Sequence, residues 1–119
     1  DCGRAIHAMN VEGQMVGGAV QGLSWGIMEQ MQYGADGRNV NANLLDYRIP
    51  TSMDVPYVES VICEIPSNNG PFGVKGVGEP PIAPGIAVVA GAIHDALGIW
   101  CHEAPITPER LIMEKDKTV

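Results

Sequence analysis

The stretch of residues 73–81 constrains the fold of this chain more than any other segment. Glycines at positions 73, 76 and 78 disfavour a helix and let the backbone approach another group closely. Glu79 follows the last of these glycines, and Pro80 restricts it to extended geometry. The segment therefore predicts a rigid loop, at the end of a strand, that presents one carboxylate. Such a carboxylate serves either as a turn or capping residue or as a positioned acid or base.

The composition of the 119 residues is that of one globular domain or part of one, with 45% hydrophobic residues. A net charge of -7 with seven Lys and Arg leaves no basic stripe, so nucleic-acid binding is not expected. The most apolar window is too short to cross a bilayer, so no membrane partner is expected. Three widely spaced cysteines and three histidines predict no metal site built by the chain, and the thiols suit a reducing, cytoplasmic compartment.

Two long helices and a short third helix are predicted from residue spacing. Within residues 11–33, apolar side chains recur at four-residue steps, and Gly18, Gly22 and Gly26 recur at the same step on another face. Because each glycine costs about 1 kcal/mol relative to alanine in a helix, this row predicts close packing against a neighbouring element. The alternative is a loosely packed helix that breaks near Gly18. Residues 85–97 form a second apolar face, and Pro108 follows a capping threonine at a third helix start.

Short extended segments complete the prediction. Residues 57–65 are rich in β-branched side chains and are predicted to form a strand, and residues 35–38 contain an Asp-Gly turn. The expected fold class is therefore α+β, with two main helices plus short strands. The loop that carries Glu79 leads directly into the helix of residues 85–97.

Glu79 is the best catalytic candidate, because its loop is glycine-lined and bounded by prolines. A glutamate that acts as a base near neutral pH needs burial or a nearby anion, whereas Lys75, four residues earlier, would stabilise its charged form. Gln14 stands near the predicted start of the first helix, where its amide and free backbone N–H groups can face an oxygen-rich ligand. The alternative for Gln14 is an ordinary polar residue. Surface or turn positions are expected for the carboxylates of Asp1, Glu29, Asp46 and Asp54.

Three segments, in this order, resemble the C-terminal part of the molybdopterin-binding large subunit of the xanthine dehydrogenase/aldehyde oxidase family. They lie at residues 1–23 (DCGRAI, VEGQ, GG and QGL), residues 46–51 (DYRIPT) and residues 76–81 (GVGEPP). The resemblance extends to about Leu111 and so covers nearly the whole chain. It departs from the family pattern at His7 and Ala8, where asparagine followed by proline is expected.

The resemblance implies a role for three residues. Glu79 matches the active-site general base, which takes a proton from a hydroxyl group on molybdenum while oxygen from water is added to an N-heterocycle or aldehyde. Gln14 matches a glutamine that hydrogen-bonds near the molybdenum oxo group, and Gly78 belongs to the same cofactor-binding set. The metal is held by the pterin in this family, so no metal ligand is expected from this chain. Electrons leave through 2Fe–2S clusters and FAD on other domains or subunits.

The resemblance also implies that much of the enzyme lies elsewhere, because the family's large subunit is several times longer. Residues 1–119 are predicted to be the C-terminal portion of a molybdopterin-binding domain, incomplete and inactive alone. The start at Asp1 without an initiator Met suits an excised domain or one polypeptide of a split subunit. Expected partners are the rest of the large subunit, iron–sulfur and flavin subunits in an oligomer, and a small-molecule substrate. The alternative is a non-catalytic interaction domain that keeps the fold without the cofactor.

Overall fold

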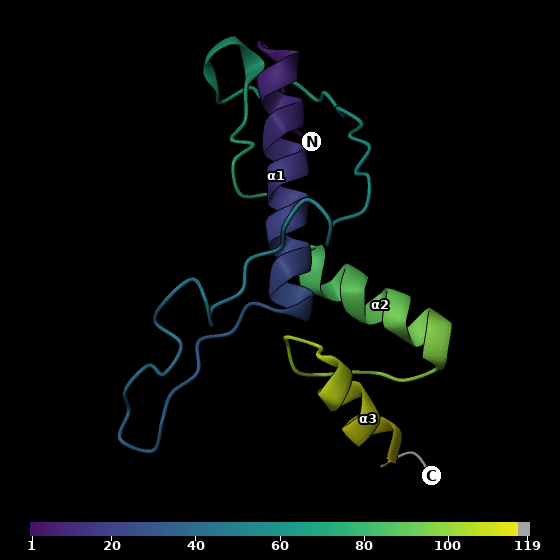
Figure 1. The fold of residues 1–119 in the computed structure, drawn as a ribbon. Coiled ribbons are helices and arrows are strands. Elements are labelled where there is room, and N and C mark those ends of the chain that lie inside the picture. Colours follow the sequence, from purple (N-terminus) through teal and green to yellow (C-terminus); the bar gives the residue numbers. More distant parts are fainter. Residues whose placement is uncertain (117–119) are drawn as a thin grey trace.

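The computed structural model describes residues 1–116, and three α-helices dominate it (Figure 1). α1 spans Ala8–Ile27, α2 spans Gly85–Leu97, and α3 spans Pro108–Asp116. A short 3₁₀ turn, η1, lies at Pro71–Gly73. Within residues 1–116 the chain forms no strand ladder. Isolated antiparallel bridges join Gly3 to Val74 and Tyr33 to Asn39.

α1 is bounded by residues that satisfy its terminal backbone groups. His7 is the N-cap, and its Nδ1 accepts the backbone N–H of Asn10 at 3.3 Å. Near the other end, Ile106 donates its N–H to the carbonyl of Gly26 at 2.6 Å. The predicted helix over residues 11–33 is therefore right in kind but wrong in its bounds: α1 starts at Ala8 and ends at Ile27.

α1 and the start of α2 touch through glycines. A Cβ atom at Gly18 would lie 2.7 Å from the side chain of Pro81, and one at Gly22 would lie 2.5 Å from the carbonyl oxygen of Ile82. Gly85, the first residue of α2, is similarly close to the backbone of Gly22. The close packing predicted from the glycine spacing is confirmed, and the alternative of a helix that breaks near Gly18 is wrong.

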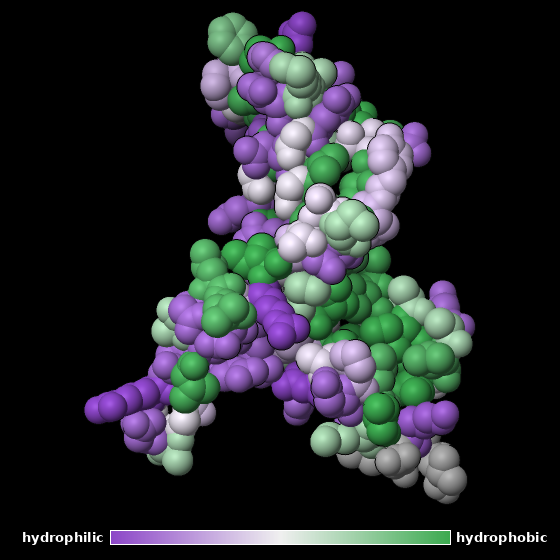
Figure 2. All heavy atoms as spheres, in the orientation of Figure 1, coloured by the Kyte–Doolittle hydropathy of each residue, from purple (hydrophilic) through white to green (hydrophobic). Residues whose placement is uncertain are grey.

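α2 and α3 have the predicted starts, and α2 also has the predicted end. Gly98 closes α2 in a left-handed conformation with φ 71°, and Thr107 Oγ1 accepts the N–H of Arg110 at the start of α3. The predicted apolar face of α2 is less well covered, because Val89 is buried while Leu97 is 59% exposed. Figure 2 shows hydrophobic residues gathered over α2 and its junction with α1.

Residues 57–65 do not form the predicted strand. This segment follows Val55 and Pro56, which with Val58 line an apolar pocket against α1. Its carbonyl at Cys63 accepts the N–H of Cys2 at 3.1 Å, but no ladder develops. A strand needs a neighbour that pairs with its alternate N–H and C=O groups, and no segment of residues 1–116 supplies one. The α+β prediction therefore holds for the helices and is not confirmed for the strands.

The described chain is extended and buries little of its apolar surface. Its radius of gyration is 17.7 Å, against about 13.5 Å for a compact domain of this length. Its accessible surface is 8680 Å², against about 6,200 Å² for a compact monomer of this mass. The buried hydrophobic side chains are Cys2, Val89 and Ile106. Among residues 1–116, no helix has the length and apolarity that a membrane crossing requires.

Candidate active-site loop

The Glu79 loop, defined here as residues 74–84, is anchored at both ends. At its start, Lys75 donates its backbone N–H to the carbonyl of Cys2 at 3.2 Å. At its end, Pro81 and Ile82 pack on the glycine face of α1. Between these anchors, residues 76–78 make no backbone hydrogen bond within the described chain. The loop is thus fixed at its two ends and makes no backbone hydrogen bond within residues 1–116 just before Glu79.

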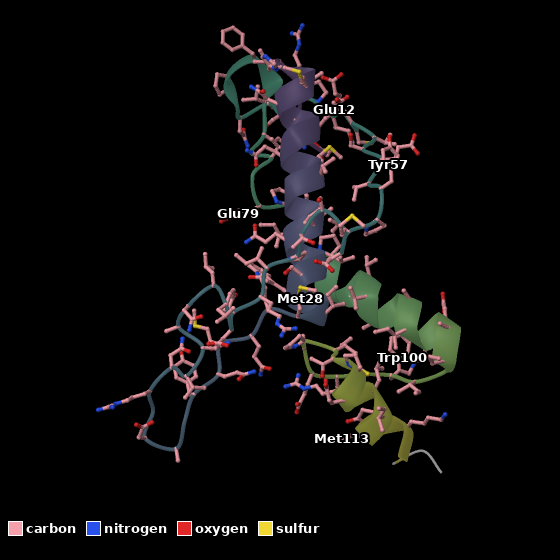
Figure 3. All side chains as sticks on the ribbon, in the orientation of Figure 1. Glu12, Met28, Tyr57, Glu79, Trp100 and Met113 are labelled. Atoms are coloured by element: carbon pink, nitrogen blue, oxygen red, sulfur yellow. The ribbon has the colours of Figure 1, made fainter. Side chains whose placement is uncertain are left out.

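Glu79 is held by its backbone while its side chain is exposed. Its carbonyl accepts the N–H of Ile82 at 2.9 Å, which closes a turn across Pro80 and Pro81. Figure 3 places Glu79 beside α1, and the residue is exposed to solvent. The loop presents one carboxylate, as predicted, but from a turn rather than from the end of a strand.

Lys75 forms an ion pair with Asp1. Its Nζ lies 2.7 Å from Oδ1 and 3.0 Å from Oδ2 of that carboxylate. Asp1 Oδ1 also accepts the backbone N–H of Gly3 at 2.9 Å. The sequence predicted a surface or turn position for Asp1 and gave no sign of this pair, because the two residues are 74 positions apart.

Gln14 lies inside α1 rather than at its start. It is the seventh residue of the helix, so its backbone N–H is not among the free groups of the first turn, and that part of the prediction is wrong. Its exposed side chain lies one turn before Gly18, which contacts Pro81. Gln14 and the Glu79 loop therefore share one side of α1. No hydrogen bond joins Gln14 to Glu79 in the described part of the chain.

Gly76 and Gly78 are open to the surface. A Cβ atom at either position would meet nothing within 4 Å, and neither residue has a positive φ. Neither the packing nor the backbone conformation of this chain therefore requires glycine there. The close approach predicted from these glycines is not made by any part of residues 1–116.

A pocket of roughly 290 Å³ connects the neighbourhoods of the two predicted site residues. Met15, next to Gln14, lines it from α1, and Pro80, next to Glu79, lines it from the loop. The other lining residues are Asp1, Cys2, Val61, Cys63, Val77 and Pro81. The pocket is thus lined by the sequence neighbours of the predicted donor and the predicted base, and neither Gln14 nor Glu79 lines it.

The loop and α1 offer an amide and open backbone to a bound group. The described residues contain no cluster of three His, Cys, Asp or Glu side chains able to hold a metal ion. The exposed amide of Gln14 can donate to an oxygen acceptor of the cofactor, and the open backbone at Gly76 and Gly78 leaves room for the group to approach. The residues present therefore fit a molybdenum–pterin group.

The other carboxylates predicted at surface or turn positions have hydrogen-bond partners within the chain. Glu29 accepts the phenol O–H of Tyr47 at 2.7 Å, and this hydrogen bond raises the pKa of Tyr47. Asp54 accepts the hydroxyl of Thr51 at 2.7 Å and its N–H at 2.8 Å, and these bonds lower the pKa of Asp54. Asp46 accepts a side-chain N–H of Asn43 at 2.9 Å. The prediction of turn or surface roles is confirmed for Asp46 and Asp54, which are exposed and bonded within three residues. It is not confirmed for Glu29, which is half-buried and bonded to a residue 18 positions away.

Comparison with known proteins identifies the class of this chain. Residues 1–56 match the family described as the molybdopterin cofactor-binding domain. The chain is 42% identical over 116 residues to the nicotine 6-hydroxylase large subunit of Paenarthrobacter nicotinovorans, covering 94% of this chain and 14% of that protein. It is 39% identical over 115 residues to the xanthine dehydrogenase molybdenum-binding subunit of Escherichia coli O157:H7, covering 96% of this chain and 15% of that protein. The crystal structure of quinoline 2-oxidoreductase from Pseudomonas putida 86 superposes with a TM-score of 0.86 at 37% identity, over 98% of this chain and 15% of that one.

The chain belongs to the molybdenum hydroxylase family that includes xanthine dehydrogenase. The resemblance predicted from sequence and the predicted molybdopterin cofactor are thereby confirmed. The chain spans 14% to 15% of the length of these relatives. The two departures from the family pattern fall at the N-cap, His7, and at the first helical position, Ala8. Asparagine and proline are favoured at those two positions, and the His7 imidazole supplies the capping acceptor instead.

Proposed function

We propose that this chain supplies the catalytic base and a cofactor-contacting amide of a molybdopterin-dependent hydroxylase. The observation that carries the proposal is the Glu79 loop, which is anchored at its start to Cys2 and at its end on the side of α1 that holds Gln14. The names of the relatives, a nicotine hydroxylase and a xanthine dehydrogenase subunit, support this chemistry. The substrate class proposed is an N-heterocycle or aldehyde.

Each residue has a defined part in this proposal. Glu79 accepts a proton as oxygen from water is added to the substrate carbon, and its turn holds the carboxylate ready for that transfer. Gln14 donates an amide N–H to an oxygen acceptor of the cofactor. The bare backbone at Gly78 permits close approach of that group. When bound, the molybdenum–pterin group supplies the two-electron oxidation, and the electrons pass to 2Fe–2S clusters and FAD outside this chain.

We further propose that residues 1–119 work only as part of a longer large subunit. Glu79 and Gln14 are both exposed, whereas a base is effective where solvent is excluded. The surface exceeds that of a compact monomer by about 2,500 Å², well above the roughly 800 Å² per partner of a standard interface. The proposed partners are the rest of the large subunit, then iron–sulfur and flavin subunits. The three free cysteines suit a cytoplasmic location.

The test is turnover by the full-length protein assembled with its partner subunits. Molybdenum and pterin are quantified first, and then oxidation of quinoline, nicotine, xanthine and an aromatic aldehyde is assayed in ¹⁸O-labelled water. We expect a loaded protein that places the label in at least one product. Glu79→Gln should keep the metal and the pterin while kcat falls about 10²- to 10⁴-fold, the usual loss for a removed general base.

Glu103→Gln is the matched control, because Glu103 is an equally exposed loop carboxylate outside the Glu79 loop. It should leave kcat unchanged. A Glu79→Gln variant with full activity in a loaded complex would refute the base assignment. A full-length protein that assembles without molybdenum would instead favour the alternative of a non-catalytic interaction domain.

A further inference from the structure

We infer that the Asp1–Lys75 ion pair is a positioning element that fixes the start of the Glu79 loop. The inference rests on the proposed role of Glu79. Lys75 and Asp1 do not touch the substrate or cofactor in this proposal. Lys75 and Asp1 instead hold the backbone segment that leads to Glu79.

The ion pair is part of a dense junction between residues 1–4 and residues 73–75. Lys75 Nζ contacts both oxygens of Asp1, at 2.7 and 3.0 Å, and the two side chains are 38% and 25% exposed. The same carboxylate accepts the N–H of Gly3. Gly3 has φ 66°, and a Cβ atom there would lie 2.5 Å from the carbonyl oxygen of Gly73. The backbones of Gly3 and Gly73 are thus in direct contact next to the ion pair.

The junction lies close enough to Glu79 in the chain to affect the position of its carboxylate. Three residues separate Lys75 from Glu79, and two of them are glycines, at positions 76 and 78, where a Cβ atom would meet nothing within 4 Å. The far end of the loop is fixed on α1 by Pro81 and Ile82. Because the far end is fixed, a shift at Lys75 displaces the residues between the two anchors, Glu79 among them. A misplacement of a catalytic group by about 1 Å can cost 10²-fold in rate.

A second ion pair in the chain is an example of one that contributes little to stability. Arg38 Nε lies 3.5 Å from Asp36 Oδ2 across a local turn, and the two side chains are 87% and 62% exposed. Exposed pairs of this kind contribute little, because solvent and salt screen them. Asp1 and Lys75 instead join segments 74 residues apart at short distance. Arg38 therefore provides an internal control.

The test uses the full-length, molybdenum-loaded protein and two uncharged variants. Lys75→Met removes the cation, and Asp1→Asn removes the anion while its Oδ1 can still accept the N–H of Gly3. We expect kcat to fall about 10- to 100-fold in each, with KM and metal content unchanged. The double variant should be no slower than either single one, because each removes the same contact. Lys75→Arg should restore most of kcat, and Arg38→Met should have no effect.

Hydrogen exchange provides a readout independent of turnover. In both single variants we expect the amide at position 75, which donates to the carbonyl of Cys2, to exchange faster than in the parent protein, with α2 unchanged. The inference is overturned if exchange is unaltered, or if the losses in kcat multiply in the double variant. It is also overturned if the acid limb of the pH–rate profile moves in opposite directions in the two variants, since that would show a direct electrostatic action on the base. Full activity of Glu79→Gln would refute the proposed base alone, because the exchange result does not depend on it.

Discussion

The junction of α1 with α2 and the arm formed by residues 29–50 are built in opposite ways. At the junction, glycines bring backbones into contact, and Val89 is buried there. The arm, which extends away from α1 in Figure 1, is held by polar side chains such as Asn41 and Tyr47. Its large hydrophobic side chains are exposed, with Leu45 at 84%. The comparison teaches that glycines hold the junction by backbone contact, whereas side-chain hydrogen bonds hold the arm, whose apolar side chains stay uncovered within residues 1–116.

The largest effect is expected from adding one methyl group at the junction. Gly22→Ala would place Cβ 2.5 Å from the carbonyl oxygen of Ile82 and 3.0 Å from Cα of Gly85, and backbone atoms cannot rotate away. We expect a loss of about 3 kcal/mol in the opening free energy of α1 and α2, at the upper end of overpacking effects. Native-state hydrogen exchange of the full-length protein measures this loss.

Gly17→Ala is the matched control for that substitution. Gly17 lies in the same helix, and a Cβ atom there would meet nothing within 4 Å. It should therefore stabilise α1 by roughly 0.5 to 1 kcal/mol through helix propensity alone. Equal effects at Gly17 and Gly22 would contradict the close backbone contact.

A smaller effect is expected in the arm, where one amide organises the backbone. Asn41 is 5% exposed, its Oδ1 accepts the N–H of Gln32 at 2.8 Å, and its Nδ2 donates to the carbonyl of Gln30 at 2.7 Å. Asn41→Ala should cost about 2 kcal/mol locally, because two backbone groups lose their partners. Faster exchange of the Gln32 amide with no change in α2 is the expected result. Asn69→Ala, at an exposed loop position, should leave both unchanged.

The phenol of Tyr47 gives a still smaller effect with a defined pH dependence. The hydrogen bond to Glu29 raises the pKa of Tyr47 above its usual value of 10.0. Its stabilisation is therefore full below about pH 10 and is lost as the pH rises through the higher folded-state value. Tyr47→Phe should cost about 1 kcal/mol in the arm at neutral pH.

Ultraviolet titration checks the pH dependence directly. The difference between the parent protein and Tyr47→Phe should show one phenol that ionises above the usual range for tyrosine. Glu29→Gln should bring that ionisation down, because it removes the anion. An unchanged midpoint in Glu29→Gln would show that the hydrogen bond to Glu29 does not set it.

The two regions also differ in how far the sequence predicts them. The bounds of α2 follow from local signals, since apolar spacing precedes a glycine that adopts φ 71° at Gly98. The end of α1 does not follow from local signals, because Met31 continues the apolar spacing beyond the last helical residue, Ile27. Asn41, ten residues further along, binds the backbone on both sides of Met31, and this contact replaces helical hydrogen bonds. The spacing of apolar residues cannot predict a hydrogen bond from a residue further along the chain that ends the helix.

In the candidate site, too, the features set by local sequence are predicted and those set by distant residues are not. Glycines and prolines around Glu79 predict a rigid loop, because they act on their own backbone. The depth of Gln14 in α1 was missed because His7 is not among the favoured capping residues, so the helix start was placed too late. The partner of Lys75 was beyond prediction, since charge alone does not select Asp1 among fourteen acidic residues. The predicted strand at residues 57–65 depends on a partner that these residues do not contain.

The smallest effect is expected at the start of α1, where the tightly packed region begins with a weak cap. His7 Nδ1 accepts the N–H of Asn10 at 3.3 Å, longer than the usual 2.9 to 3.0 Å for such bonds. Asparagine is among the strongest N-cap residues, so His7→Asn should stabilise the first turn by roughly 0.5 kcal/mol. The measurement is hydrogen exchange of the first-turn amides at constant pH. His102→Asn, at an exposed position outside any helix, should change nothing. If His7→Asn instead destabilised α1, the imidazole would have a role beyond capping, and the tight region would depend on its N-terminal cap as well as on its glycines.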